Sequence, residues 1–225
     1  LAESSAAAVA AAHAFAKLDD VSFLSALRRG NVHGALDNGL SPGLLPGRST
    51  LDAGAARFSD AWPSVPSTPG HDAAGILAAA KAGEIDVLVL LGCDPINDMP
   101  DFDLADAGLS GARTVISVEM LPSDSTVRFA DVVLAAAAPT ETSGTFTNLE
   151  GRVSVCEQKV TPAGTSRPDW MIAAELALRL GNDLGLDSPE QIRAELAAVS
   201  AVHGDLTEEA LEAGRVDGVL ISGSG

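Results

Sequence analysis

Three loops hold the residues best placed to bind a ligand, because each of them directly follows an apolar segment typical of a buried strand. These loops span residues 92–98, 119–125 and 135–142. In an open α/β sheet, ligands bind outside the carboxyl ends of the strands. The first loop contains Gly92, Asp94 and Pro95, and a glycine there allows the backbone to approach a ligand closely. These loops are therefore the first candidates for a binding site.

The first loop matches no nucleotide-binding motif. It lacks the G-x-G-x-x-G pattern, and the chain contains no Walker loop. The sequence therefore argues against a nicotinamide or ATP site. Two interpretations of the loop remain open: a ligand-binding turn, or a tight turn in which Asp94 or Asp98 caps the following helix.

A second candidate is the polar segment from Glu141 to Arg152, beyond the third predicted strand. It concentrates small hydroxylated and amide residues, two glycines and one arginine. Thr147, Asn148 and Arg152 have the chemistry to hold a polar ligand. The same side chains equally satisfy backbone groups in turns, so both interpretations stand at this point.

Other patterns indicate no catalytic or metal site. The aspartates between residues 94 and 106 lack the EF-hand order and favour helix N-termini. The string Gly39-Leu40-Ser41-Pro42-Gly43 matches a nucleophile elbow, but Pro42 has no N–H for an oxyanion hole. The four histidines occur singly, and Cys93 and Cys156 form no CxxC pair. Such cysteine usage fits a reducing compartment.

Charge and hydropathy exclude two classes of partner. The chain has 31 acidic and 14 basic side chains and a net charge of −17, which would repel a phosphate backbone, so we expect no nucleic-acid partner. The longest apolar runs, 87–91 and 132–138, are far shorter than a membrane-spanning helix requires, so we expect no direct membrane insertion. The chain begins at Leu1 and ends in Ser-Gly repeats, which we interpret as the ends of an excised fragment.

The predicted elements form an α/β domain. Continuous apolar strands at 87–91, 114–118 and 131–134 are separated by helical crossovers, and this pattern predicts a parallel sheet with helices on both faces. Helices are also expected at 2–18, after the N-cap Asp72, and after Pro168. The Gly/Pro-rich segment 30–70 should contain little regular structure and hints at an interaction surface.

Two domains are predicted. Residues 1–185 would form the α/β domain, including the Gly/Pro-rich segment 30–70. Residues 186–225 would form a small helical appendage followed by a truncated linker, since the capping box Ser188-Pro189-Glu190-Gln191 starts a helix and no strong strand accompanies it.

An ordered series of short motifs carries a family resemblance. The series consists of Ala130-Asp131-Val132-Val133-Leu134, Glu141, Ser143-Gly144-Thr145, Thr147-Asn148, Glu150-Gly151-Arg152, Arg167-Pro168-Asp169-Trp170 and Arg179-Leu180-Gly181. In this order and spacing it resembles the molybdopterin oxidoreductase superfamily. Leu91-Gly92-Cys93-Asp94-Pro95 is similar to the G-x-N-P turn of that family. The motifs in 30–47 resemble the branch found in bacterial complex I.

Within the superfamily, the chain looks like the C-terminal region of the large iron-sulfur subunit of NADH-quinone oxidoreductases. The resemblance implies a molybdopterin oxidoreductase-like fold that has lost the molybdenum cofactor. It implies other subunits of the complex I peripheral arm as partners, and a peripheral location on the cytoplasmic side of the bacterial membrane. Iron-sulfur clusters would lie upstream, because two cysteines cannot ligate a cluster alone.

Departures from the family pattern favour a vestigial cofactor site. Asp94 stands where the family has asparagine, and Asp124 adds a second acid near the predicted edge of the sheet. Carboxylates are poorly suited to the phosphates of a pterin dinucleotide. We therefore expect a structural, non-catalytic domain that supports electron transfer from NADH to quinone. The vestigial pterin-site candidates are Gly92, Asp94, Pro95, Thr147, Asn148 and Arg152.

Two other hypotheses remain. The chain also resembles the pterin-dinucleotide-binding portion of a molybdenum or tungsten oxidoreductase such as a formate dehydrogenase. The same six residues would then lie near molybdopterin guanine dinucleotide, and the metal ligand would lie elsewhere in the protein. A weaker hypothesis is an unrelated binding module that uses the segment 30–70.

Overall fold

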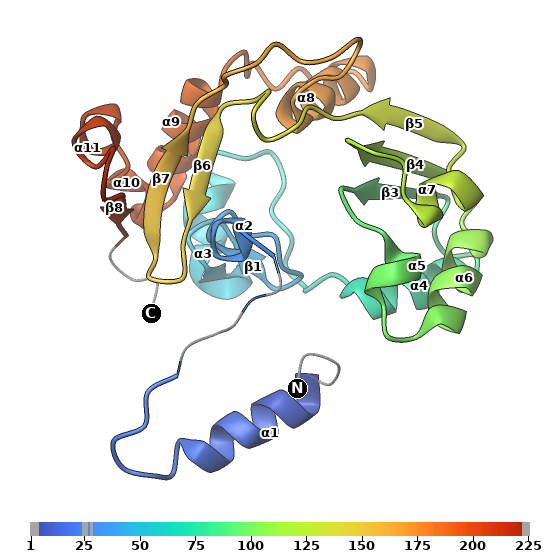
Figure 1. The fold of residues 1–225 in the computed structure, drawn as a ribbon, viewed down its shortest axis with the longest axis horizontal. Helices are drawn as coiled ribbons and strands as arrows, with labels where there is room; N and C mark the ends of the chain where they lie inside the picture. The colour runs from blue at the N-terminus through green and yellow to red at the C-terminus, as the bar shows by residue number, and fades with distance from the viewer. Residues whose placement is uncertain (1–4, 24–26, 28, 222–225) are drawn as a thin grey trace.

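A three-stranded parallel sheet forms the centre of one half of the molecule (Figure 1). The computed structural model describes residues 5–23, 27 and 29–221. The sheet has the order β3-β4-β5 and consists of β3 (Val87–Leu91), β4 (Thr114–Glu119) and β5 (Val132–Ala135). Val89, Ile116 and Val132 lie side by side in the register. The predicted parallel α/β class is confirmed.

Helices cover one face of this sheet, called here the covered face. They are α4 (Ala73–Lys81), α5 (Pro95–Asp98), α6 (Phe102–Gly111) and α7 (Asp124–Phe129). Helix α4 starts at the predicted cap, since Asp72 accepts a hydrogen bond from the Gly75 N–H (2.8 Å), and α6 starts at Asp101, which accepts from the Leu104 N–H (2.9 Å). The buried core between helices and sheet consists of Leu77, Leu88, Leu90, Ile96, Ala105, Leu109 and Val115.

The second face of the sheet is covered at one end only. There α8 (Asp169–Arg179) packs Ile172 against Val118 and Leu134. The rest of that face, called here the open sheet face, consists of Val87, Val89, Leu91, Ile116 and Val132. The three β3 residues are 51–54% exposed. Helices were expected on both faces of the sheet. In the described residues the second face carries a helix only at the end where α8 packs on it.

A second half is built on an antiparallel sheet with the order β6-β7-β8. Its strands are β6 (Gly144–Thr147), β7 (Arg152–Cys156) and β8 (Val219–Leu220). The helices beside it are α9 (Pro189–Val199), α10 (Ala201–Gly204) and α11 (Glu208–Ala213). The helix after Ser188 was predicted, whereas β6 lies in the polar segment from Glu141 to Arg152. The two-domain division at residue 185 stays a prediction.

The C-terminal segment packs into this second half. Leu211 and Ile221 form a buried cluster with Val153 of β7. Val199 packs with Leu45 and Phe58 from the early part of the chain. These contacts tie the last helices to two strands and a helix that lie far away in the sequence.

The expectation of little regular structure in 30–70 was wrong. The segment forms α2 (Val32–Asp37), β1 (Leu44–Leu45), β2 (Ser49–Thr50) and α3 (Leu51–Ser59). Within α3, a β-carbon at Gly54 would lie 2.7 Å from the Leu45 side chain, so close packing explains this glycine. Phe58 on the same helix is 1% exposed, which anchors the segment in the core.

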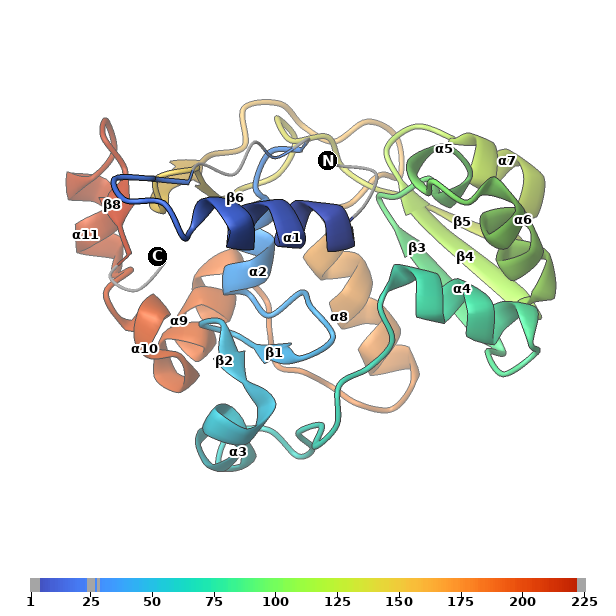
Figure 2. The same ribbon diagram turned by 90° about the horizontal axis from the view of Figure 1, so that it is seen from below.

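The first helix stands apart from both halves. Helix α1 (Ser5–Phe15) agrees with the helix expected at 2–18. Figure 1 shows it away from the sheets, and Figure 2 shows the same arrangement from below. None of the helices in the described residues has both the length and the apolar character needed to cross a membrane.

Candidate functional site

The loop after β3 is held by its own side chains. Gly92 adopts a positive φ of 57°, which turns the chain out of the strand. Asp94 accepts hydrogen bonds from the N–H (3.2 Å) and hydroxyl (2.5 Å) of Ser125, and from the Asn97 amide (2.7 Å). Pro95 is the first residue of α5. Asp94 occupies the N-cap position of that helix without making the capping bond that was one of the two interpretations.

These hydrogen bonds control the charge of Asp94. Desolvation by burial acts to raise the pKa of its carboxyl group, but hydrogen bonds from the side chains of Ser125 and Asn97 outweigh it and hold the pKa below the ordinary value. The carboxylate therefore stays ionised at neutral pH. A negative charge therefore remains in the loop after β3.

The loop after β4 contains a second internally bonded carboxylate. Glu119 is 8% exposed and accepts hydrogen bonds from the Ser123 N–H (3.0 Å), the Ser123 hydroxyl (2.9 Å) and the Thr126 hydroxyl (2.8 Å). Asn97 also donates to Asp124 (3.0 Å). The first two loops are thus joined by hydrogen bonds that run from one strand end to the next.

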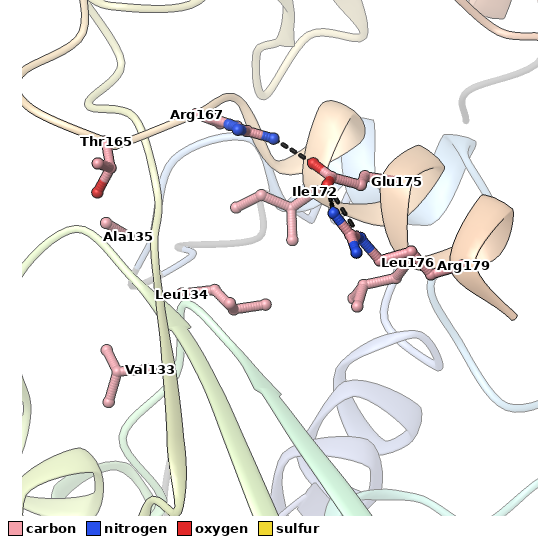
Figure 3. A pocket seen from close by; sticks show the side chains of 9 residues that line it. All are labelled: Val133, Leu134, Ala135, Thr165, Arg167, Ile172, Glu175, Leu176 and Arg179. Atoms are coloured by element: carbon pink, nitrogen blue, oxygen red, sulfur yellow. Dashed lines mark hydrogen bonds and ion pairs between the residues drawn. The ribbon is translucent and has the colours of Figure 1, made fainter.

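A hollow of about 400 Å³ lies beside the third loop, between β5 and α8 (Figure 3). Its floor is apolar, with Leu134 and Ile172. On its rim Arg179 donates to Glu175 (2.6 and 3.0 Å), and Arg167 pairs with the same carboxylate. Hydrogen bonding from Arg179, with the charge of Arg167, holds the pKa of Glu175 below its usual range. Because the two arginines share one carboxylate, this rim keeps one excess positive charge.

The β6–β7 hairpin carries the other three candidates. Asn148 Oδ1 accepts hydrogen bonds from the N–H groups of Glu150 and Arg152, both at 2.9 Å, so it stabilises its own turn. Arg152 pairs with Glu150 (3.2 Å). Thr147 is 6% exposed, and its N–H donates to Asn31 Oδ1 (2.9 Å). A hollow of about 430 Å³ beside the hairpin includes Thr147 and Asn148.

The structure separates the six predicted residues into two groups. Gly92, Asp94 and Pro95 follow β3, whereas Thr147, Asn148 and Arg152 belong to the hairpin on the other side of the molecule in Figure 1. The hollow beside the hairpin contains no residue of the first group.

Residues 29–31 link these groups, and their role was not predicted from the sequence. Arg29 pairs with Asp98 (2.5 Å), whose other carboxylate oxygen accepts from the Asp94 N–H (3.1 Å). Asn31 binds Thr147 and also donates to the Thr145 carbonyl (3.3 Å). Asn31 has a φ of 60°, and the asparagine after Gly30 was the signal available for such a left-handed turn.

The described residues offer little to a metal or to a pterin dinucleotide. They contain no group of three His, Cys, Asp or Glu side chains arranged to hold a metal ion. Cys93 is partly buried, and that burial raises the pKa of its thiol. Phosphates need free cationic donors, but Arg29 and Arg152 are paired with carboxylates and the strand ends carry Asp94, Glu119 and Asp124. Among the described residues, the ends of β3 and β4 therefore present no free cation to the phosphates of a pterin dinucleotide.

Comparisons with known proteins give a matching family profile and several curated relatives. The profile described as "Molybdopterin oxidoreductase" matches residues 3–179. The NADPH-Fe(3+) oxidoreductase alpha subunit of Geobacter sulfurreducens is 32% identical over 170 residues, which cover 75% of this chain and 20% of that protein. The NADH-quinone oxidoreductase G subunit of Streptomyces coelicolor is 36% identical over 193 residues, 82% of this chain and 23% of that protein.

A third relative is named as a formate dehydrogenase subunit. The F420-dependent formate dehydrogenase alpha subunit of Methanocaldococcus jannaschii is 30% identical over 195 residues, which cover 84% of this chain and 28% of that protein. The chain therefore spans between 20% and 28% of the length of these curated relatives.

Proposed function

Because this chain belongs to the molybdopterin oxidoreductase family, we propose that it is a structural, non-catalytic domain of a longer subunit of the NADH-quinone oxidoreductase type. Its role is to support the part of the protein that carries electrons from NADH to quinone. Relatives from Streptomyces coelicolor and Rhizobium meliloti, both named as G subunits of NADH-quinone oxidoreductase, support this assignment at 36% and 34% identity.

The arrangement around Asp94 carries the proposal. Both oxygens of this carboxylate are engaged, one by Ser125 and the other by Asn97. A working dinucleotide site needs neutral or cationic donors at this strand end. Here both oxygens of the ionised carboxylate accept hydrogen bonds from within the fold, and these bonds join two loops. This is the role expected of a residue in a structural domain.

The remaining assignments follow from the same proposal. The partners are other subunits of the peripheral arm of a complex I-type enzyme, and the location is peripheral, on the cytoplasmic side of the bacterial membrane. Any iron-sulfur clusters belong to other parts of the protein, because Cys93 and Cys156 lie in different halves of this domain and cannot ligate a cluster alone.

The test is the metal and pterin content of the intact protein. Elemental analysis for Mo, W and Fe is combined with the fluorescence of oxidised pterin. The expected result is iron without molybdenum, tungsten or pterin. Stoichiometric molybdenum or tungsten together with pterin would overturn the structural assignment.

One observation favours a second candidate function, the pterin-dinucleotide-binding portion of a formate dehydrogenase-type enzyme. The hollow beside the hairpin contains two of the six candidates, Thr147 and Asn148, and its volume of about 430 Å³ lies in the range of small-molecule sites. The relative from Methanocaldococcus jannaschii is named a formate dehydrogenase subunit. The same metal and pterin analysis separates the two functions.

A further inference from the structure

The open sheet face is an uncharged apolar surface on a chain that is otherwise strongly acidic. Val87, Val89 and Leu91 are each about half exposed, at 51%, 51% and 54%, and their neighbours in the register are Thr114, Ile116 and Val118. Parallel sheets are normally covered on both faces, because the crossovers between strands place helices there. An exposed surface of this kind marks an interaction site.

The helices that connect the strands cannot cover this face. The β3–β4 and β4–β5 connections run through α6 and α7, and both lie on the covered face, where α6 packs against α4. Two right-handed crossovers that proceed in one direction along a sheet place their helices on the same side. Helix α8 reaches the second face only where Ile172 packs against Val118 and Leu134.

Helix α1 contributes no described residue to a buried hydrophobic cluster. Its sequence, SAAAVAAAHAF, contains no Asp, Glu, Lys or Arg, and Val9 and Phe15 are 55% and 56% exposed. Among the described residues, none from α1 belongs to the four buried clusters. A helix that is apolar on all sides is normally buried, and an isolated helix of this length is only marginally stable in water.

We propose that α1 packs on the open sheet face in the intact protein and completes the helical cover of the parallel sheet. The dimensions agree, since 11 helical residues extend about 16 Å and the five residues of β3 also extend about 16 Å. Alanine at most positions of α1 allows close approach to the strands. The connecting residues 16–31 can span up to about 50 Å, so the tether permits this contact.

Charge favours α1 over a second copy of the chain as the occupant. Two copies that joined their open faces would each bring a net charge of −17, and their mutual repulsion opposes association. Helix α1 brings no carboxylate, and the open sheet face has none among its five residues. Burial of these two apolar surfaces against each other is therefore not opposed by charge.

The first experiment is cysteine cross-linking in the intact protein, with Cys93 and Cys156 changed to alanine. Val89→Cys is combined with Val9→Cys or with Ala11→Cys, because residues two apart on a helix point about 200° apart and so sample both sides of α1. We expect an intramolecular disulfide in one of these pairs. Val127→Cys on α7, on the covered face and 75% exposed, is the matched control and should form none with either α1 position.

Two outcomes of cross-linking overturn the proposal. A disulfide that forms only between two molecules would identify a second copy as the occupant. If neither pair forms a disulfide, α1 does not lie on this face, and a different polypeptide is left to cover it.

The second experiment measures release of α1. Val89→Asp places a carboxylate in the contact, while Val127→Asp places the same charge at an exposed site elsewhere. Proteolysis of a locally opened segment follows the population of the open form. We expect the rate of trypsin cleavage after Lys17 to rise roughly tenfold in Val89→Asp and to stay unchanged in Val127→Asp, with circular dichroism showing that both variants are folded. Equal cleavage rates in the two variants would contradict the proposal.

Discussion

Asp94 accepts two hydrogen bonds from Ser125, one from the backbone N–H at 3.2 Å and one from the hydroxyl at 2.5 Å. The two residues are 31 positions apart, and Ser125 is fully buried at the start of α7. The hydroxyl of Ser125 in turn accepts from the Ile96 N–H (3.1 Å). Asp94 therefore joins the β3 and β4 loops through a buried serine.

The first prediction is that Asp94→Ala destabilises the protein by about 1–3 kcal/mol, because the Ser125 donors lose their acceptor. Ser125→Ala should cost a similar amount, and the double variant less than the sum of the two. Urea unfolding measures these changes. Asp103→Ala, an exposed acid of the same segment, is the control and should change the free energy of unfolding by less than about 0.5 kcal/mol. Additive costs at 94 and 125 would show that the contact does not couple the loops.

This contact also has a pH signature. The pKa of Asp94 is lowered in the folded protein, so its contribution is complete above the unfolded pKa of about 3.9 and is lost as the pH falls through the folded value. The stability difference between the unmodified protein and Asp94→Asn should therefore shrink on acidification below about pH 4. A difference that is constant down to the acid transition would argue against an ionised Asp94.

The second prediction concerns Asn148, whose side chain bonds two N–H groups of its own turn. Asn148→Ala should cost about 1 kcal/mol in the free energy of unfolding, because two turn donors lose their acceptor. Under the proposed function the metal and pterin content of the intact protein should not change. A variant that is stable but depleted of pterin would instead support the cofactor-binding alternative. Thr142→Ala, in the same polar segment, is the matched control.

The third prediction is a pH dependence that arises from His203. The ring is 7% exposed, and Nδ1 lies 2.8 Å from the Ser200 hydroxyl. Desolvation lowers the pKa of His203, partly opposed by the charge of Asp37. The unfolded chain therefore binds more protons, and stability should fall as the pH drops below about 6.5. His203→Gln should flatten this dependence in thermal unfolding between pH 5 and 7.

The fourth prediction tests the packing of α4 against α6. A β-carbon at Gly111 would lie 2.4 Å from the Ala80 carbonyl oxygen, which is backbone and cannot rotate away. Gly111→Ala should therefore destabilise the protein by about 1–3 kcal/mol, despite the better helix propensity of alanine. Gly204→Ala, where the nearest atom is 3.9 Å from the added carbon, is the matched control and should be neutral or slightly stabilising. Chemical denaturation of both variants makes the comparison.

Local signals were sufficient for the elements of the parallel sheet. The apolar run of β3 and the N-caps Asp72 and Ser188 were recognisable because capping and strand patterns depend on residues that are adjacent in the chain. The ordered motifs between residues 130 and 181 were also enough to indicate the family that the profile match supports.

Long-range packing decided the features that the sequence did not predict. Helix α3 packs against Val199, which is remote from it in the sequence, so the composition of the segment 30–70 did not reveal the helix. Whether Asp94 caps its helix or accepts hydrogen bonds from Ser125 depends on the spacing of two strands. The separation of Asp94 from Asn148 depends on how Arg29 and Asn31 connect the two halves. The sequence by itself determined the family, the parallel sheet and its caps, because these rest on periodicity and local hydrogen bonding. Only the tertiary structure decided which polar groups form hydrogen bonds with one another and which face of the sheet stays open. Both depend on contacts between distant segments.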